Sequence, residues 1–544
     1  MSDDGTPRWR LVVWWVTTVL AGVLVLVALV VPNQLSHVGP AALVRIPIEG
    51  ILGVLLLAVL PERPRRVVAI VAGAALGVLL IGKIIDMGFY RVLDRPFNAV
   101  FDWPLLTDAV EFLRRSIGRL GATAAVVGAV LLVVAVLGLM TLSVLRLSAL
   151  VVRHRTVALR TTAGLGVAWV TCAALGVQIA AGAPVASWSA SALAADRLGQ
   201  LPANLRDERA FTAALKVDAF RDAPGADLLT SLRGKDVIVA FVEAYGRAAI
   251  EDPRLAPGVG AVLDDGERRL TAAGYGSRSA FLTSPTFGGG SWLAHSTLLS
   301  GLWVNNEERY RTLLASDRFT LTGAFHRAGW RTVGVMPAVR EPWPEGQRFY
   351  GYDKLYTAPD LGYRGPLFAF GSMPDQYTLS AFQRAERATP GHAPLMAEIV
   401  LLSSHLPWVP VPRLVDWDRV GDGTVFDGTV GDGVSPELML RDRDRAVPAY
   451  GRSVEYSLSA LVSYVEHSGD DNLVLVMLGD HQPASVVAGE RARRDAPISI
   501  VARDPAVLDR ISSWGWPDGL KPDPAAPVWR MDTFRDRFLT AYGP

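Results

Sequence analysis

The chain has 544 residues, of which 50% are hydrophobic and 20% are charged, with 54 Lys and Arg against 53 Asp and Glu. This near-zero net charge argues against a nucleic-acid partner, which would require a clustered basic face. The single cysteine, Cys172, excludes an intrachain disulfide. Because Cys172 lies in an apolar segment, the remainder of the chain also lacks Cys-based catalysis and a thiolate metal site.

Apolar residues are concentrated in the first third of the chain, in runs of about twenty residues that are long enough to cross a bilayer as helices. Five such runs cover residues 11–31, 38–60, 67–85, 122–145 and 158–181. The first run lacks a small-residue cleavage site and exceeds the apolar core of a signal peptide, so it is interpreted as a retained anchor. We therefore expect residues 1–186 to form a transmembrane domain with five spans.

The charges of the loops predict the orientation of these spans, because short cytoplasmic loops collect Lys and Arg. The loop between the first two runs, residues 33–37, has His37 as its only basic side chain. By contrast, the basic residues before the first run and in the expected inner loops are Arg8, Arg10, Arg63, Arg65, Arg66, Arg146, Arg153 and Arg155. The pattern predicts a multi-pass plasma-membrane protein with a cytoplasmic amino terminus and an extracytoplasmic domain after the fifth span.

After the last run the composition changes twice. Residues 187–234 are polar helix formers and are expected to be an amphipathic connector along the membrane surface. From residue 235 to 544, short apolar strands alternate with helices, which predicts an α/β domain with a largely parallel sheet between helices. The expected strands are 236–242, 331–336, 397–402, 472–478 and 497–502, and the expected helices include 321–328 and 453–466.

A glycine-rich stretch, SPTFGGGSWLAHSTLLSG at residues 284–301, leads into an apolar segment with helical periodicity. Ser291 follows three glycines, Gly288 to Gly290, and is expected to be the N-cap of a helix. Backbone N–H groups and the positive end of the helix dipole favour an anion at this place. A serine hydroxyl there can act as a nucleophile on a phosphate or sulfate, although the pattern alone also fits an ordinary capped helix.

Polar residues follow three of the expected strands. Glu243 ends the first strand, His405 follows the third in SSHLPW, and Asp480 and His481 follow the fourth in LGDHQP. In an open α/β sheet these carboxyl ends are the edge where ligands bind. These two carboxylates, the hydroxyl of Ser291 and an imidazole suit a divalent metal such as Zn²⁺ or Mn²⁺ as ligands.

In these motifs the chain resembles the alkaline phosphatase and sulfatase superfamily, and more narrowly its membrane-anchored branch, the lipoteichoic acid synthases and phosphoethanolamine transferases. The resemblance implies five membrane helices before an extracytoplasmic sulfatase-like domain. It also implies that one divalent ion (Mn²⁺, Zn²⁺ or Mg²⁺) is held by Glu243, Ser291, Asp480 and His481, and that His405 is a substrate-side histidine.

Two departures from the family pattern affect what the resemblance implies. Ser291 stands where the synthases have a threonine nucleophile, so Thr286, Ser296 and Thr297 remain rivals, although the last two lie more than a turn into the helix. The Cys/Ser-x-Pro-x-Arg signature of true sulfatases is missing, which makes hydrolysis of sulfate esters the weaker interpretation.

Arg340 and Trp343, in AVREPWPEG after the second strand, are candidate substrate-binding residues. A guanidinium fork suits a phosphate, and an indole ring can cover a head group. The alternative is a solvated loop punctuated by prolines.

We therefore expect a metal-dependent enzyme that transfers a phosphoglycerol-type or phosphoethanolamine-type head group from a membrane phospholipid through a covalent Ser291 intermediate. The acceptor is an envelope glycan, a lipid or water. One alternative is a phosphodiesterase or sulfatase-like hydrolase of the same superfamily. Another is a catalytically silent membrane protein that binds a head group.

Overall fold

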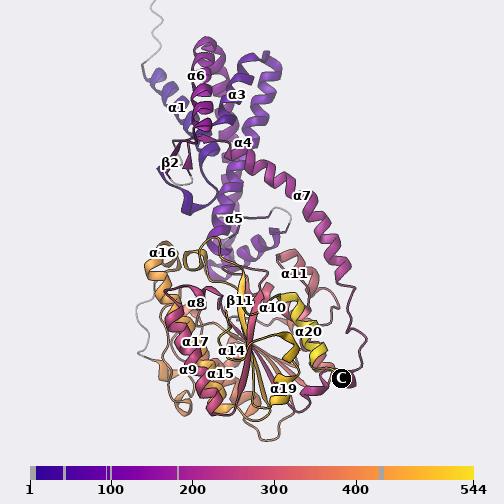
Figure 1. The fold of residues 1–544 in the computed structure, drawn as a ribbon. Coiled ribbons are helices and arrows are strands. Elements are labelled where there is room, and N and C mark those ends of the chain that lie inside the picture. Colours follow the sequence, from indigo (N-terminus) through magenta and orange to yellow (C-terminus); the bar gives the residue numbers. More distant parts are fainter. Residues whose placement is uncertain (1–7, 41–43, 94, 99–100, 181–182, 428–433) are drawn as a thin grey trace, which may run out of the picture. The chain divides into compact units, whose positions relative to one another are not determined.

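The computed structural model describes residues 8–40, 44–93, 95–98, 101–180, 183–427 and 434–544 (Figure 1). The chain forms two compact units, residues 1–207 and 208–544. The long helix α7 (Ser189–Ala214) crosses this division. The expected connector, residues 187–234, consists of this helix and a following segment with short 3₁₀ turns, and its role along a membrane surface stays a prediction.

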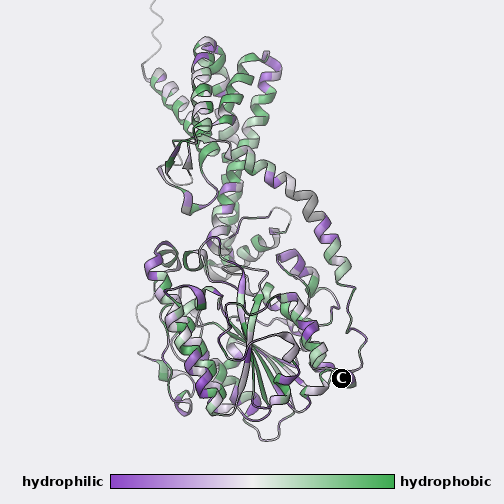
Figure 2. Cartoon of the chain, viewed as in Figure 1, coloured by the Kyte–Doolittle hydropathy of each residue, from purple (hydrophilic) through white to green (hydrophobic). Residues whose placement is uncertain are grey.

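The first unit is built from apolar helices, which Figure 2 shows largely in green. These helices are α1 (Arg8–Val30), α3 (Ile48–Val59), α4 (Glu62–Leu93), α5 (Trp103–Arg153) and α6 (Arg155–Ala174). Among the described residues, four helical segments are long and apolar enough to cross a membrane: Val12–Val30, Glu62–Arg91, Ile117–Arg153 and Arg155–Ala174.

The second expected span, residues 38–60, differs from the prediction, because the long helix among its described residues is the 12-residue α3 in its last part. At 1.5 Å per residue, α3 is about 18 Å long, which is shorter than the ~30 Å hydrocarbon core. The helix starts late because Ile46 and Pro47 form the short strand β1, which pairs with β4 (Ala186–Ser187). Pro47 also has no amide to continue a helix backward. Residues 41–43 of this span lie outside the described residues.

Contacts within the first unit show which helix ends lie together. At one end of the bundle, Arg146 near the end of α5 donates to Oγ1 of Thr18 in α1 at 2.9 Å. Leu57 of α3, Ala69 of α4 and Val144 of α5 form an apolar cluster toward the same end. At the other end, Lys83 of α4 donates to the carbonyl of Ala28 at 2.8 Å. Most of the arginines that precede the first span or lie in the expected inner loops are therefore at the end of the bundle where α1 begins.

The first turn of α7 lies at the opposite end of the bundle from these arginines. Its Ser189 donates to the carbonyl of Leu29 near the end of α1. Its Ser191 donates through both its amide and its hydroxyl to Glu49 in the first turn of α3, each at 2.8 Å. The chain thus enters the bundle at one end and leaves it at the other.

The second unit contains an eight-stranded sheet in the order β12-β6-β11-β10-β5-β9-β7-β8. Strands β10, β5, β9, β7 and β8 are mutually parallel, whereas β11 is antiparallel to both of its neighbours. The strands are β5 (Asp236–Val242), β6 (Gly276–Thr283), β7 (Arg331–Met336), β8 (Lys354–Thr357), β9 (Leu395–Leu401), β10 (Leu473–Gly479), β11 (Asp495–Ala502) and β12 (Val528–Arg530). The predicted α/β fold with a largely parallel sheet is confirmed, and all five expected strands are present.

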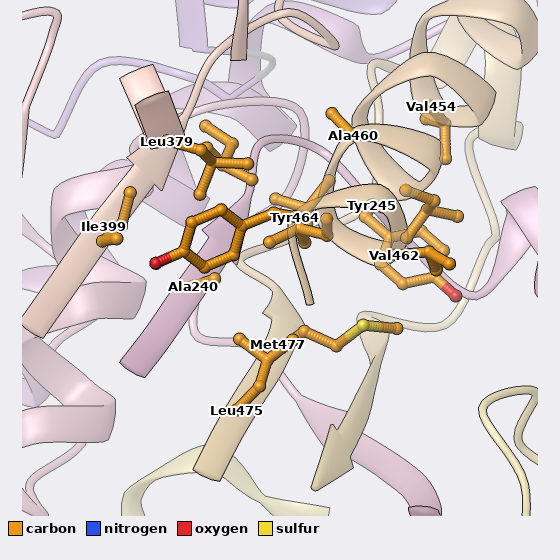
Figure 3. Packing of buried hydrophobic residues seen from close by; sticks show 14 of the residues in the cluster. Ala240, Tyr245, Leu379, Ile399, Val454, Ala460, Val462, Tyr464, Leu475 and Met477 are labelled. Atoms are coloured by element: carbon orange, nitrogen blue, oxygen red, sulfur yellow. The ribbon is translucent and has the colours of Figure 1, made fainter. Parts of the chain in front are cut away.

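Helices cover both faces of the sheet. One apolar cluster packs α9 (Ala256–Ala272), α15 (Asp375–Phe382) and α17 (Arg443–Ser468) against one face. Figure 3 shows part of this layer, with Tyr464 and Ala460 of α17 near Ala240, Ile399 and Met477 of the strands. A second cluster packs α10 (Ser291–Ser300), α12 (Leu321–Arg327) and α20 (Phe534–Ala541) against the other face. The central strands are therefore largely apolar, and most of their polar side chains lie near the strand ends.

Candidate metal and nucleophile site

Two carboxylates meet where neighbouring parallel strands end. Val242 of β5 is paired with Gly479 of β10, so the next residues, Glu243 and Asp480, are adjacent at the carboxyl edge of the sheet. Ligand atoms of Glu243, Asp480 and His481 all lie within 4.8 Å of one another. The structure thus brings together three of the four residues that the sequence proposed as metal ligands.

The electrostatics of this group favour a cation. Glu243 and Asp480 are buried, at 4% and 0% exposure. Burial and the neighbouring charge of Asp480 raise the pKa of Glu243 well above its usual range. Asp480 Oδ1 accepts the N–H groups of Ala244 at 2.7 Å and of His481 at 2.8 Å, while its Oδ2 is buried without a hydrogen-bond partner. A divalent metal would bind this unpaired oxygen of Asp480 together with the buried carboxylate of Glu243, and would thus compensate both.

Ser291 completes the group. Its Oγ donates to Glu243 Oε2 at 2.9 Å and lies 3.1 Å from Nε2 of His481. Nδ1 of His481 faces the carbonyl of Gln482 at 2.7 Å, so Nδ1 carries a proton and Nε2 presents its lone pair in the neutral ring. The single proton of the Ser291 hydroxyl cannot serve two acceptors at once. A metal ion bound by Glu243, Asp480, His481 and Ser291 would remove this conflict.

The N-cap expected at Ser291 is wrong by one residue. Helix α10 starts at Ser291, and its N-cap is Gly290, with a left-handed φ of 80° and no side-chain cap. Gly288 is also left-handed (φ 72°), and its N–H donates to the carbonyl of Gln482 at 3.0 Å. Because two left-handed positions are required, glycine stands where a capping side chain would otherwise be. The Ser291 side chain is consequently free to face Glu243.

The rival hydroxyls have different surroundings. Ser296 shares a hydrogen bond of 2.9 Å with Tyr350, and Thr297 donates to the carbonyl of Leu293 at 2.7 Å. Both are fully buried in the packing of α10. Thr286 is also buried, and its Oγ1 has no hydrogen-bond partner.

His405 follows β9 at the same edge of the sheet. Its Nδ1 faces the carbonyl of Leu406 at 2.7 Å, which leaves Nε2 with the lone pair in the neutral ring. Burial lowers the pKa of His405. The nearby charge of His481 also lowers this pKa, whereas the charge of Asp480 raises it. The imidazole stacks on the ring of Phe370, with centroids 3.8 Å apart and planes at 28°.

Arg340 and Trp343 are the two further candidates for substrate binding. Arg340 is exposed and donates to the carbonyl of Gly371 at 2.5 Å, so it holds the turn that carries Phe370 against His405. Trp343 is half-buried and packs near Tyr350 in the core, with ring centroids 6.0 Å apart. Their roles in substrate binding stay predictions.

The sequence did not reveal Asp375, which holds the His405 segment in place. It is fully buried, and its Oδ1 accepts the N–H groups of Leu402 at 2.8 Å and Ser403 at 3.0 Å. Its Oδ2 accepts the hydroxyl of Ser457 at 2.6 Å. The available signal was Pro374 followed by an acidic residue, which is typical of a helix start but does not identify the loop that the carboxylate binds.

Divalent metal should stabilise the protein, because it neutralises two buried carboxylates. An ion at 100 times its Kd stabilises the folded state by about 2.7 kcal/mol. We expect Mn²⁺ to raise the apparent Tm of the full-length protein over that in EDTA, as measured by differential scanning fluorimetry. Glu243→Gln should lose this rise, yet its metal-free form should be at least as stable as the metal-free wild type, because the repulsion is removed.

Asp264→Asn is the matched control, since Asp264 is exposed and pairs with Lys521 at the surface. This variant should keep the full metal-dependent rise. A Glu243→Gln protein with an undiminished rise would contradict the site.

No protein-family model and no curated protein matches the sequence. Among solved structures, the phosphoethanolamine transferase EptA of Neisseria meningitidis has 12% identity and a TM-score of 0.45, covering 96% of this chain and 95% of its own. The lipoteichoic acid synthase LtaP of Listeria monocytogenes has 15% identity and a TM-score of 0.35, covering 54% and 71%. The phosphoglycerol transferase GacH of Streptococcus pyogenes has 12% identity and a TM-score of 0.36, covering 62% and 90%. These similar structures are of the same kinds that the sequence motifs resemble.

Proposed function

We propose that this chain is a metal-dependent membrane enzyme that transfers a phosphorus-containing head group from a lipid to an envelope acceptor through a covalent Ser291 intermediate. The head group is of the phosphoglycerol or phosphoethanolamine type. The observation that carries the proposal is the position of the Ser291 hydroxyl, 2.9 Å from Glu243 and 3.1 Å from His481 at the start of a helix. Apolar helices in the same chain support a lipid as the donor.

Glu243, Ser291, Asp480 and His481 would hold one divalent ion, and their mixed oxygen and imidazole donors suit Mn²⁺ or Zn²⁺ better than Mg²⁺. When bound, the ion would lower the pKa of the serine hydroxyl and stabilise negative charge on the phosphoryl oxygens. The positive end of α10 points to the same place and adds to the stabilisation of a bound phosphate.

The reaction has two displacements. In the first, Ser291 Oγ loses its proton and bonds to phosphorus, and the bond from phosphorus to the lipid oxygen breaks, so the lipid alcohol leaves after gaining a proton. In the second, an acceptor hydroxyl loses its proton and bonds to phosphorus, and the bond to Ser291 breaks. His405 contributes by binding the substrate or exchanging one of these protons at Nε2, because its Nδ1 is committed to the Leu406 carbonyl.

Ser291→Ala should abolish turnover in full-length protein reconstituted into vesicles, with loss of product from both phosphatidylglycerol and phosphatidylethanolamine donors. Ser291→Thr should retain part of the activity, because a threonine hydroxyl can occupy the same position. The measurement is release of fluorescent diacylglycerol from each labelled donor in the presence of Mn²⁺.

Thr286→Val is the control in the same loop. Valine has nearly the same shape as threonine, and the substitution removes a hydroxyl that has no hydrogen-bond partner. We therefore expect activity and Tm close to those of the wild type. An active Ser291→Ala protein, or an inactive but folded Thr286→Val protein, would refute the assignment of the nucleophile.

We also propose that the amino terminus is cytoplasmic and that residues 208–544 lie outside the plasma membrane. The gathering of arginines at the end of the bundle where α1 begins, with α7 leaving from the other end, supports this orientation. A reporter that is active only outside the cytoplasm, fused after Pro544, should be active. Activity of a cytoplasm-only reporter at the same position would reverse the orientation.

A further inference from the structure

A buried carboxylate in the core of the second unit has no part in the proposed reaction. Glu398 lies in the middle of β9 at 1% exposure, between Met396 and Val400, which belong to the apolar cluster on that face. The hydroxyl of Tyr352 donates to its Oε2. Because a buried charge is strongly unfavourable without compensation, an apolar residue would serve packing better at this position.

The second partner of Glu398 comes from the nucleophile helix. His295 of α10 is 8% exposed, and its Nδ1 lies 3.4 Å from Glu398 Oε1. Its ring stacks on Phe241 of β5, with centroids 3.9 Å apart and planes at 23°. His295 therefore contacts two neighbouring strands of the sheet at once.

These contacts lie directly behind the reactive hydroxyl. Ser291 and His295 are four residues apart on α10 and so share one face of the helix. Phe241 of β5 is two residues before Glu243, which directly follows the strand, so by the alternation of side chains the two lie on the same side. The His295–Phe241 stack is thus one helical turn behind the 2.9 Å contact between Ser291 and Glu243.

The rotation of α10 about its axis depends on its polar contacts, because these contacts have defined directions. Most of the helix is buried by apolar side chains such as Leu298 and Leu299, whose contacts have no preferred direction. Ser296 and Tyr350 share a hydrogen bond, and His295 faces Glu398, so two consecutive residues of α10 make contacts with defined directions. A rotation of the helix would break both contacts and displace Ser291.

We propose that His295 is a positioning residue, whose contact with Glu398 fixes α10 in the rotation that holds the Ser291 hydroxyl against Glu243. This role rests on the proposed function, because it matters only if Ser291 is the nucleophile. His295 touches neither the substrate nor the metal ligands in this account. It acts through the helix that carries Ser291.

The test compares two variants of the full-length protein. His295→Phe keeps the stacked ring but leaves Glu398 with only one of its two partners, Tyr352, so the Tm should fall. The double variant His295→Phe/Glu398→Leu removes both polar groups while retaining most of the volume, so the Tm should recover part of this fall, although the Tyr352 hydroxyl loses its acceptor. Its kcat for bis(4-nitrophenyl) phosphate should nevertheless fall on the order of 10- to 100-fold, with KM within about twofold, because the nucleophile is misplaced.

Metal binding provides a readout that is independent of turnover. Because Ser291 is one of the four proposed ligands, the Kd for Mn²⁺ measured by titration calorimetry should rise about tenfold in the double variant. Wild-type kcat and Kd in a folded double variant would overturn the proposal. If the double variant does not fold, the single variant His295→Phe, which also lacks the contact with Glu398, should show the same loss of kcat, and wild-type kcat there would equally overturn it.

Two parallel variants separate this inference from the proposed function. His326→Phe is the control, because His326 also faces a carboxylate, Asp353 at 3.3 Å, but lies exposed on α12; its kcat should be unchanged. Ser291→Ala must be inactive for either proposal to stand. An inactive Ser291→Ala protein beside a fully active double variant would refute the positioning role alone.

Discussion

The repulsion between two buried carboxylates is the constraint on which the site depends. Glu243 and Asp480 follow paired positions of β5 and β10, so the parallel sheet itself places their charges side by side away from water. Such a pair is stable only if it is protonated or if a cation lies between the oxygens. Burial and the neighbouring charge of Asp480 raise the pKa of Glu243, and Oδ2 of Asp480 has no hydrogen-bond partner, so the negative charge of the pair is not balanced. A divalent metal removes the imbalance, and the hydroxyl that lies against it is that of Ser291.

The surrounding backbone holds the two strand ends at a fixed separation. Asp480 accepts the N–H of Ala244, whose φ of 54° is in the left-handed region, so the turn after β5 is strained and tied to the turn after β10. Gly479 is required there, because a Cβ atom would lie 1.8 Å from the carbonyl oxygen of Tyr245. The glycine loop before α10 is fastened to the same turn through the hydrogen bond from Gly288 to Gln482. The site is therefore made of three loops that are connected by hydrogen bonds.

Much of this arrangement could be predicted from the sequence, because the buried parallel strands are continuous apolar runs that end at polar residues. The edge strands β8 and β12 and the strand next to β12, β6, are not evident from the sequence, since their polar or short sequences lack such a pattern. The N-cap was misplaced because capping preference ignores the left-handed φ that only Gly290 satisfies easily. Residues such as Asp375, Phe370 and Glu398 act through partners far away in the chain, and a single sequence does not show which strands and loops become neighbours. The second span was expected to be longer because hydropathy does not detect the pairing of β1 with β4.

The central claim, that Ser291 carries the head group between donor and acceptor, is tested most directly by isolating the intermediate. Full-length protein in vesicles containing phosphatidylglycerol or phosphatidylethanolamine, with Mn²⁺ and no added acceptor, is quenched in acid and its peptides are mapped by mass spectrometry. The account predicts a phosphorus-containing head group on Ser291, which disappears when an acceptor alcohol is added. An adduct on Thr286, Ser296 or Thr297, or full turnover without any adduct, would contradict it.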